Sequence, residues 1–220
     1  MRDELRVQVT LTEPVRVSWP QVFEPKAVMI QGKPTGEPFY SARLVFPADH
    51  DDIQDLRVTA SQLLAKLKPG VDLKTLTPYK DFFYPFKSGA ALIKEAKERS
   101  AAKGEKYRGF DDYMDGCHTL YAKAFPKNPP QLDVFLNGKW TKLSAENRAL
   151  YKDRFYNGML AVGSVTLAGI NLPTGGWGVA CYLNGLAAVE GGEHIGRQEI
   201  TYGYVPSVTG VTTDFDPIPS

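Results

Sequence analysis

Two apolar runs of equal length, separated by a short turn, constrain the fold of this chain more than any other feature. Residues 159–170 (MLAVGSVTLAGI) and 178–189 (GVACYLNGLAAV) flank the segment NLPTGGW, which carries one proline and two glycines. Proline and glycine favour tight turns, and apolar runs bounded by such residues are typical of buried strands. The pattern predicts a β-hairpin inside a closed sheet.

Shorter segments alternate between apolar and polar residues, as half-buried strands do. They cover 5–11, 39–46 and 117–125, and the period of Val15 and Val17 continues to Trp19. Asn137-Gly138 is a strong hairpin signal and joins 132–136 to 139–143. In that register Phe135 lies opposite Trp140, and Asp133 lies opposite Lys142. Many short strands with close turns predict a small barrel or sandwich.

Three segments have helical character. Residues 49–67 place leucines on one face, and Asp49, Asp51 and Asp52 crowd the start of the segment, where a helix dipole favours negative charge. Helix-start chemistry explains this acidic cluster better than a metal site does. Residues 90–103 predict an exposed helix, and residues 144–152 predict a short one with Ser144 as its N-cap. Helices and strands do not alternate, which disfavours an α/β sheet.

Charge is unevenly distributed although the net charge is only +1. Residues 66–154 hold 18 Lys and Arg against 11 Asp and Glu, and the remainder holds 8 against 14. A polyanion could therefore dock on the middle of the chain. The alternative is a solvated Lys-rich insertion with no ligand.

Other features narrow the class of protein. The run 159–170 is too short and too interrupted to span a bilayer, and the N-terminus lacks the apolar core of a signal peptide. Cys117 and Cys181 do not make a disulfide framework, so a reducing cytosol is expected. No phosphate loop, nucleophile elbow or HExxH motif occurs. Adjacent Cys117 and His118 would face opposite sides of a strand, which disfavours a zinc site. We expect no enzyme, metal or cofactor.

Aromatic and basic residues interleave in two places, at Tyr84–Lys87 and at Tyr121–Lys127. Single-stranded nucleic acids bind where bases stack on aromatic rings and Lys or Arg follows the phosphates. Tyr121, Lys123 and Phe125 share one face of a strand, which makes the second run the better candidate. The rival interpretation buries Tyr121 and Phe125 in the core.

Several segments resemble a bacteriophage family of single-stranded DNA-binding proteins. They are RVSWPQVFEPKA at 16–27, GEPFYSARLVFP at 36–47, PFKSG at 85–89, LYAKAFPKNPPQLDVFLNGKW at 120–140, and 156–197 as a whole. The resemblance implies a mainly β fold: an OB-fold-like five-stranded barrel with inserted helices at about 49–67, 90–103 and 144–152. We expect a single domain over 1–210, with an insertion at about 86–116 and a short acidic, Pro-containing tail at 211–220.

The same resemblance implies the function. Such proteins coat exposed single-stranded DNA without sequence preference during phage replication and recombination, in the cytoplasm of the infected bacterium. A tail such as Asp214, Phe215, Asp216 and Ile218 would contact replication proteins. No membrane partner is expected, and a homodimer stays open. One alternative is a structural or interaction β-barrel of a phage without nucleic-acid binding. A second is an enzyme with a small-molecule pocket behind a flap at 90–116. The residues expected to bind DNA are Arg43, Lys80, Tyr84, Phe86, Lys87, Arg108, Tyr121, Lys123, Phe125, Lys127, Trp140 and Trp177.

Overall fold

Alternation of apolar and polar residues builds a barrel in the computed structural model, which describes residues 5–30, 33–172 and 175–196. Its five strands, within that described part, are β2 (Val15–Ile30), β3 (Lys33–Phe46), β5 (His118–Ala124), β8 (Leu160–Asn171) and β9 (Trp177–Val189). The ring runs β2–β3–β5–β9–β8 and returns to β2. Only the β5–β9 pairing of this ring is parallel. This order is the Greek-key barrel of an OB-fold, as the sequence predicts.

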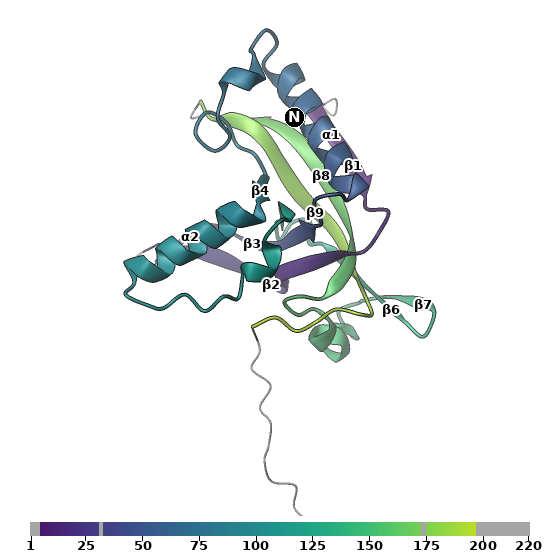
Figure 1. The fold of residues 1–220 in the computed structure, drawn as a ribbon. Coiled ribbons are helices and arrows are strands. Elements are labelled where there is room, and N and C mark those ends of the chain that lie inside the picture. The colour runs from purple at the N-terminus through teal and green to yellow at the C-terminus, as the bar shows by residue number, and fades with distance from the viewer. Residues whose placement is uncertain (1–4, 31–32, 173–174, 197–220) are drawn as a thin grey trace, which may run out of the picture.

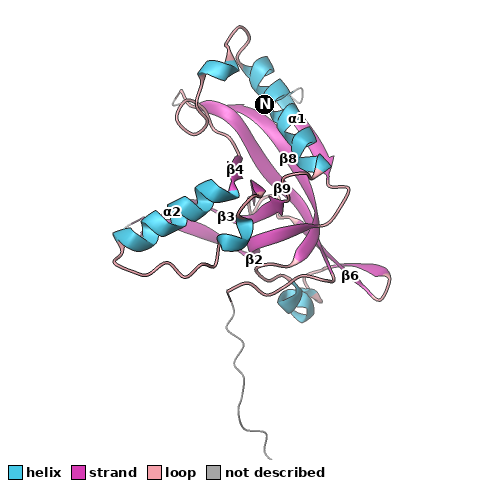
Figure 2. Cartoon of the chain, in the orientation of Figure 1, coloured by secondary structure: helices cyan, strands magenta, loops and turns pink. Residues whose placement is uncertain are grey.

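The remaining elements surround the barrel (Figure 1). Strand β1 (Arg6–Thr10) pairs with β8, and the hairpin of β6 (Gln131–Leu136) and β7 (Lys139–Lys142) extends from β9. The short strand β4 (Phe86–Ser88) pairs with β5. The helices, cyan in Figure 2, lie outside the strands. They are α1 (Asp51–Leu67), α2 (Gly89–Ala102) and the 3-10 helices η2 (Leu73–Thr75), η3 (Asp112–Met114) and η4 (Arg148–Arg154).

The barrel core consists of the inward-facing half of each strand. Along β3 and β5, Leu44 lies opposite Leu120 and Ala42 lies opposite Ala122, and all four are fully buried. A layer of large residues therefore follows a layer of small ones along these two strands, and both layers belong to the buried core. Helix α1 packs against β8 and β9 and contributes Ile53, Leu56 and Leu63 to the same core.

The hairpin predictions are confirmed in detail. Strands β8 and β9 pair along their length, as the two long apolar runs predict. In the β6–β7 hairpin, Phe135 pairs with Trp140 and Asp133 pairs with Lys142. Asn137 and Gly138 both have positive φ, 51° and 75°, which is the conformation of a type I′ turn.

Helix prediction is less accurate. Helices α1 and α2 lie within two residues of the predicted ranges, 49–67 and 90–103. The short helix predicted at about 144–152 is present as a 3-10 helix, η4, but it covers Arg148–Arg154, and turns occupy 145–147. Ser144 still accepts a hydrogen bond from Asn147 N, so it caps a turn instead of an α-helix. The predicted tail at 211–220 lies outside the described residues.

Asp52 belongs to the acidic cluster at the start of α1, but unlike Asp51 it also has a structural role. Its side chain is buried, and its carboxylate accepts hydrogen bonds from Thr12 N (2.9 Å) and Thr12 Oγ1 (3.0 Å). Asp51, beside it in the first turn, is exposed. The buried carboxylate therefore fastens the β1–β2 connection to α1, whereas its neighbour serves the helix dipole alone.

We expect Asp52→Ala to lower the free energy of unfolding by about 2 kcal/mol, because two hydrogen bonds to a charged group are lost. Asp51→Ala, the matched control, should cost no more than about 1 kcal/mol, because only its interaction with the helix dipole is lost. Urea denaturation followed by circular dichroism measures both. Equal losses for the two variants would contradict the role assigned to Asp52.

Candidate nucleic-acid interface

The outer face of β3 and β5 carries a row of basic, aromatic and polar side chains. The strands are antiparallel, with Arg43 opposite Tyr121 and Ser41 opposite Lys123. Because neighbours along a strand point to opposite faces, burial of Leu44 and Ala122 inside the barrel turns Arg43 and Tyr121 outward. Tyr121 and Phe125 are half-buried and do not belong to the core, which removes the main support for the rival interpretation.

The cations on this face lie close to aromatic rings. The Arg43 guanidinium carbon is 5.4 Å from the centroid of the Tyr121 ring. Lys123 Nζ is 5.5 Å from the same centroid and 4.3 Å from that of Phe39. Such distances allow cation–π attraction, which holds the long basic side chains beside the rings. Phe39 was not predicted as a site residue, although it comes from the GEPFYSARLVFP segment.

Burial affects the charge of both cations. It lowers the pKa of the Arg43 guanidinium and that of the Lys123 ammonium below their ordinary values. An arginine pKa starts so high that Arg43 stays charged at neutral pH. Among the described residues, neither cation lies within 4.0 Å of a carboxylate. The face therefore offers positive charge that no protein carboxylate neutralises at close range.

Trp19 is the clearest residue that sequence reasoning missed. Its period with Val15 and Val17 predicts burial, yet its side chain is 56% exposed. The β2 register shifts between Ser18 and Gln21, and Trp19 takes a φ of +47°, so this bulge turns its side chain out of the alternation. Asn157 Oδ1 holds the conformation by accepting a hydrogen bond from Trp19 N at 2.9 Å. The proline that follows Trp19 is the signal that could have marked the bulge.

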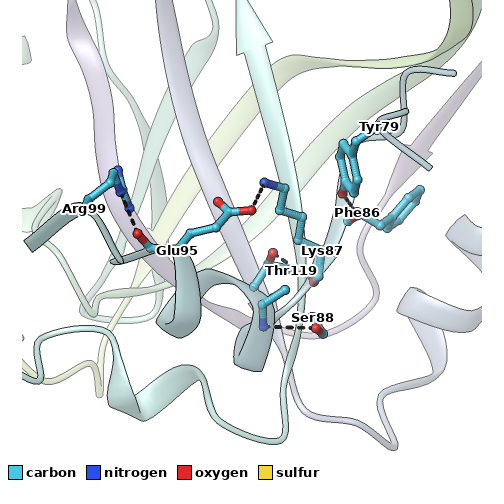
Figure 3. Close-up of polar contacts among 8 residues, drawn as sticks. Tyr79, Phe86, Lys87, Ser88, Glu95, Arg99 and Thr119 are labelled. Carbon is cyan, nitrogen blue, oxygen red and sulfur yellow. Dashed lines mark hydrogen bonds and ion pairs between the residues drawn. The ribbon is translucent and has the colours of Figure 1, made fainter. Parts of the chain in front are cut away.

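The predicted insertion, residues 86–116, forms an arm that packs on the outer side of the barrel. Leu92 of α2 and Met114 of η3 cluster with Val45 of β3. Figure 3 shows how the base of this arm is fastened. Thr119 Oγ1 of β5 donates to Lys87 O (3.1 Å), and Ser88 Oγ caps α2 by accepting from Ala91 N (3.2 Å). The arm is thus attached to the strand that carries Tyr121 and Lys123.

The first aromatic–basic run does not join this face. Phe86 is 2% exposed and belongs to the core, so its predicted role as a stacking residue is wrong for this structure. Tyr84 packs against the same core, 4.9 Å from Phe86 between ring centroids. Lys87 Nζ lies 2.5 Å from Glu95 Oε1 and 4.8 Å from the Tyr79 ring centroid, so contacts within the protein occupy its charge. The run serves mainly to seat the arm.

The remaining predicted residues are dispersed. Trp177 is half-buried and stacks on Phe82 with ring centroids 5.5 Å apart, so it covers part of the core. Trp140 is 57% exposed but sits on the β6–β7 hairpin, which Figure 1 shows on the side of the barrel away from α2. Lys80, Arg108 and Lys127 are exposed, on the segment before β4, on the arm and beyond β5 respectively. Arg43, Tyr121, Lys123 and Phe125 are the predicted residues that share one face.

In the part of the chain that the structure describes, no three His, Cys, Asp or Glu side chains gather in a group that could hold a metal ion. None of the helices described there has the length and apolar character that crossing a bilayer requires.

The fold resembles solved phage proteins. The single-stranded DNA-binding protein from bacteriophage Enc34, in complex with ssDNA, is 17% identical, with a TM-score of 0.55 over 88% of this chain and 90% of that chain. Another structure of the Enc34 protein is 16% identical, with a TM-score of 0.55 over 90% of this chain and 88% of that chain. At such low identity these likenesses establish the fold alone. No curated protein matches the chain.

A sequence model of a protein family identifies the family of this chain. The model described as Enterobacter phage Enc34, ssDNA-binding protein, matches residues 7–202, which include the barrel and the arm. The family is named for binding and not for a catalysed reaction, in agreement with the prediction of a non-enzymatic protein. The chain therefore belongs to the family of the Enterobacter phage Enc34 ssDNA-binding protein, and the family resemblance seen in its sequence is confirmed.

Proposed function

We propose that this chain binds single-stranded DNA, with broad tolerance of sequence, on the outer face of β3 and β5. The observation that carries the proposal is the row of Arg43, Tyr121, Lys123 and Phe125 on one face of the barrel. In OB-folds generally, the face of the second and third barrel strands binds oligonucleotides. Here those strands are β3 and β5. Membership of a family named for ssDNA binding gives independent support.

The chemistry of this face suits a single strand better than a duplex. Accessible rings, such as half-buried Tyr121 and exposed Trp19, can stack only on bases whose faces are free, as they are in a single strand. Arg43 and Lys123 offer charge to the phosphates without reading the bases of most nucleotides. By coating exposed strands inside an infected bacterium, the protein would serve phage DNA replication and recombination without catalysing a reaction itself.

Binding to an oligo-dT strand should weaken as salt rises, because phosphate contacts release counterions. The logarithm of the association constant should fall against the logarithm of salt concentration by about 0.7 for each phosphate contacted. Filter binding at several salt concentrations measures the slope, with a duplex of equal length as the comparison. Equal affinity for both forms, or no salt slope, would overturn the proposed function.

Tyr121→Ala and Trp19→Ala should each weaken binding of oligo-dT by about 1–3 kcal/mol if the rings stack on bases. Trp140→Ala, an equally exposed aromatic on the distant β6–β7 hairpin, should change affinity much less. Lys123→Gln should mainly reduce the salt slope, by about 0.7. Far-UV circular dichroism must remain native in all four variants. Unfolding of Tyr121→Ala would mean that its ring stabilises the barrel, and equal losses at Trp140 would place the interface elsewhere.

We also propose that residues 211–220 contact a replication partner. The segment carries Asp214 and Asp216 beside Phe215 and Ile218, and it resembles the acidic ends of such proteins. Its carboxylates could compete with phosphates for the basic face. Deleting 211–220 should then tighten DNA binding modestly, and most at low salt, where charges are least screened. Affinity that stays unchanged at low salt would contradict this competition.

A further inference from the structure

A hollow of about 420 Å³ lies between the outer face of the barrel and the arm. Ser18, Trp19, Arg43 and Tyr121 line it from the barrel, and Asp111 and Met114 line it from the arm. Helix α2, which Figure 1 shows on the outside of the strands, packs on β3 through Leu92 and Val45. The volume is in the range of pockets that enclose small ligands, about 300–1,000 Å³.

A buried polar atom in the lining lacks a partner. Nε of Arg43 is buried, and no hydrogen-bond partner for it lies among the described residues. Ser18, which is 1% exposed in the same lining, differs because its side chain interacts with that of Tyr113. Buried polar groups in folded proteins nearly always make hydrogen bonds, so an unpartnered one is consistent with a site for a bound group. The guanidinium nitrogen can only donate, so that group must supply an acceptor.

Asp111 determines what kind of group fits. It contributes a carboxylate to the same hollow, and among the described residues it makes no ion pair within 4.0 Å of Arg43 or Arg99. A carboxylate can only accept hydrogen bonds and repels a phosphate. Arg99 also lines the hollow, so the occupant must offer acceptors to two arginines and donors to Asp111. A nucleobase held beside the rings of Trp19 and Tyr121 can offer both, whereas a phosphodiester offers acceptors alone.

We infer that this hollow is a pocket for one unstacked base and that it prefers guanine. Guanine presents O6 and N7 as a pair of acceptors, which arginine binds in bidentate fashion. It also presents N1–H and the N2 amino group as a pair of donors on the adjoining edge, which a carboxylate can accept. Thymine has one donor on its ring, and adenine offers arginine no comparable acceptor pair. Cytosine has an acceptor pair but only one donor group.

This inference rests on the proposed function and deepens it. Most nucleotides of a bound strand would be held without regard to sequence, and one position would discriminate between bases. A good bidentate base contact favours the correct base by about tenfold or more. The arm supplies Asp111, so the selectivity would belong to the insertion at 86–116 and not to the barrel.

The test compares four oligonucleotides just long enough to bind one molecule: oligo-dT, and the same strand with one central dG, dA or dC. Fluorescence anisotropy at constant salt gives the affinity of each. We expect the dG strand to bind about tenfold more tightly than oligo-dT. Equal affinity for all four strands would overturn the base pocket while leaving single-strand binding intact. A failure to bind any of the four would instead overturn the proposed function itself, and a preference for dC or dA would overturn the guanine assignment.

Asp111→Asn, compared with a charge-matched control, tests whether the Asp111 carboxylate accepts hydrogen bonds from guanine. The variant should lose most of its preference for the dG strand over oligo-dT. Asp115→Asn is the matched control, because Asp115 is an exposed acid of the same arm that does not line the hollow. It removes the same charge and should leave the ratio of dG to dT affinity unchanged. A ratio that falls equally in both variants, or survives in Asp111→Asn with a native circular dichroism spectrum, would overturn the role of Asp111.

Discussion

A single bridge, between Lys123 of β5 and Tyr182 of β9, joins the two barrel strands that run parallel. One edge of β5 pairs with β3 along the whole strand, and the other edge pairs first with β4 and then with β9. With both edges occupied, the strand cannot slip by one residue without moving Leu120 and Ala122 out of the core. The register that closes the barrel is therefore also the register that turns Tyr121 and Lys123 outward.

The arm depends on the same strand. Strand β4 pairs with β5 at Phe86 and Leu120, and the burial of Phe86 secures the start of the arm in the core. At Gly89, a Cβ would lie 1.6 Å from Met114 O, so only glycine lets η3 approach the beginning of α2 this closely. That approach brings Met114 and Asp111 over the barrel face. Gly89 does not itself line the hollow, so a larger residue there would alter the hollow by displacing Met114.

Sequence patterns predicted the strands well, because turns and alternation depend on residues that are close together in the sequence. The Asn137-Gly138 turn determines the β6–β7 register by itself, and the alternation along 117–125 identifies the outward face of β5. The candidate site was harder to predict, because two runs of similar composition have different fates. The run Tyr121–Lys127 begins in β5 and continues past its end, and the outer face of β5 carries Tyr121 and Lys123. Phe86, from the other run, pairs with β5 through β4 and is buried in the core. Only tertiary pairing distinguishes them. The arm at 86–116 is set apart by its composition, but nothing local indicates that Asp111 lines the same hollow as Arg43.

Trp19 shows why an exception to the pattern can be more informative than agreement with it. A residue other than glycine with positive φ costs on the order of 1–3 kcal/mol, and such strain persists only where surrounding contacts impose it. Here Asn157 imposes it: its Oδ1 accepts from Trp19 N, and its Nδ2 donates to Ile195 O at 3.0 Å. A regular β2 would have placed this large apolar ring in the core, where burial would stabilise the fold. The chain instead forgoes that stabilisation and holds the ring at the edge of the hollow. The exposed ring of Trp19 lies with Arg43 and Tyr121 in the lining of that hollow, which is consistent with the stacking role proposed for this face.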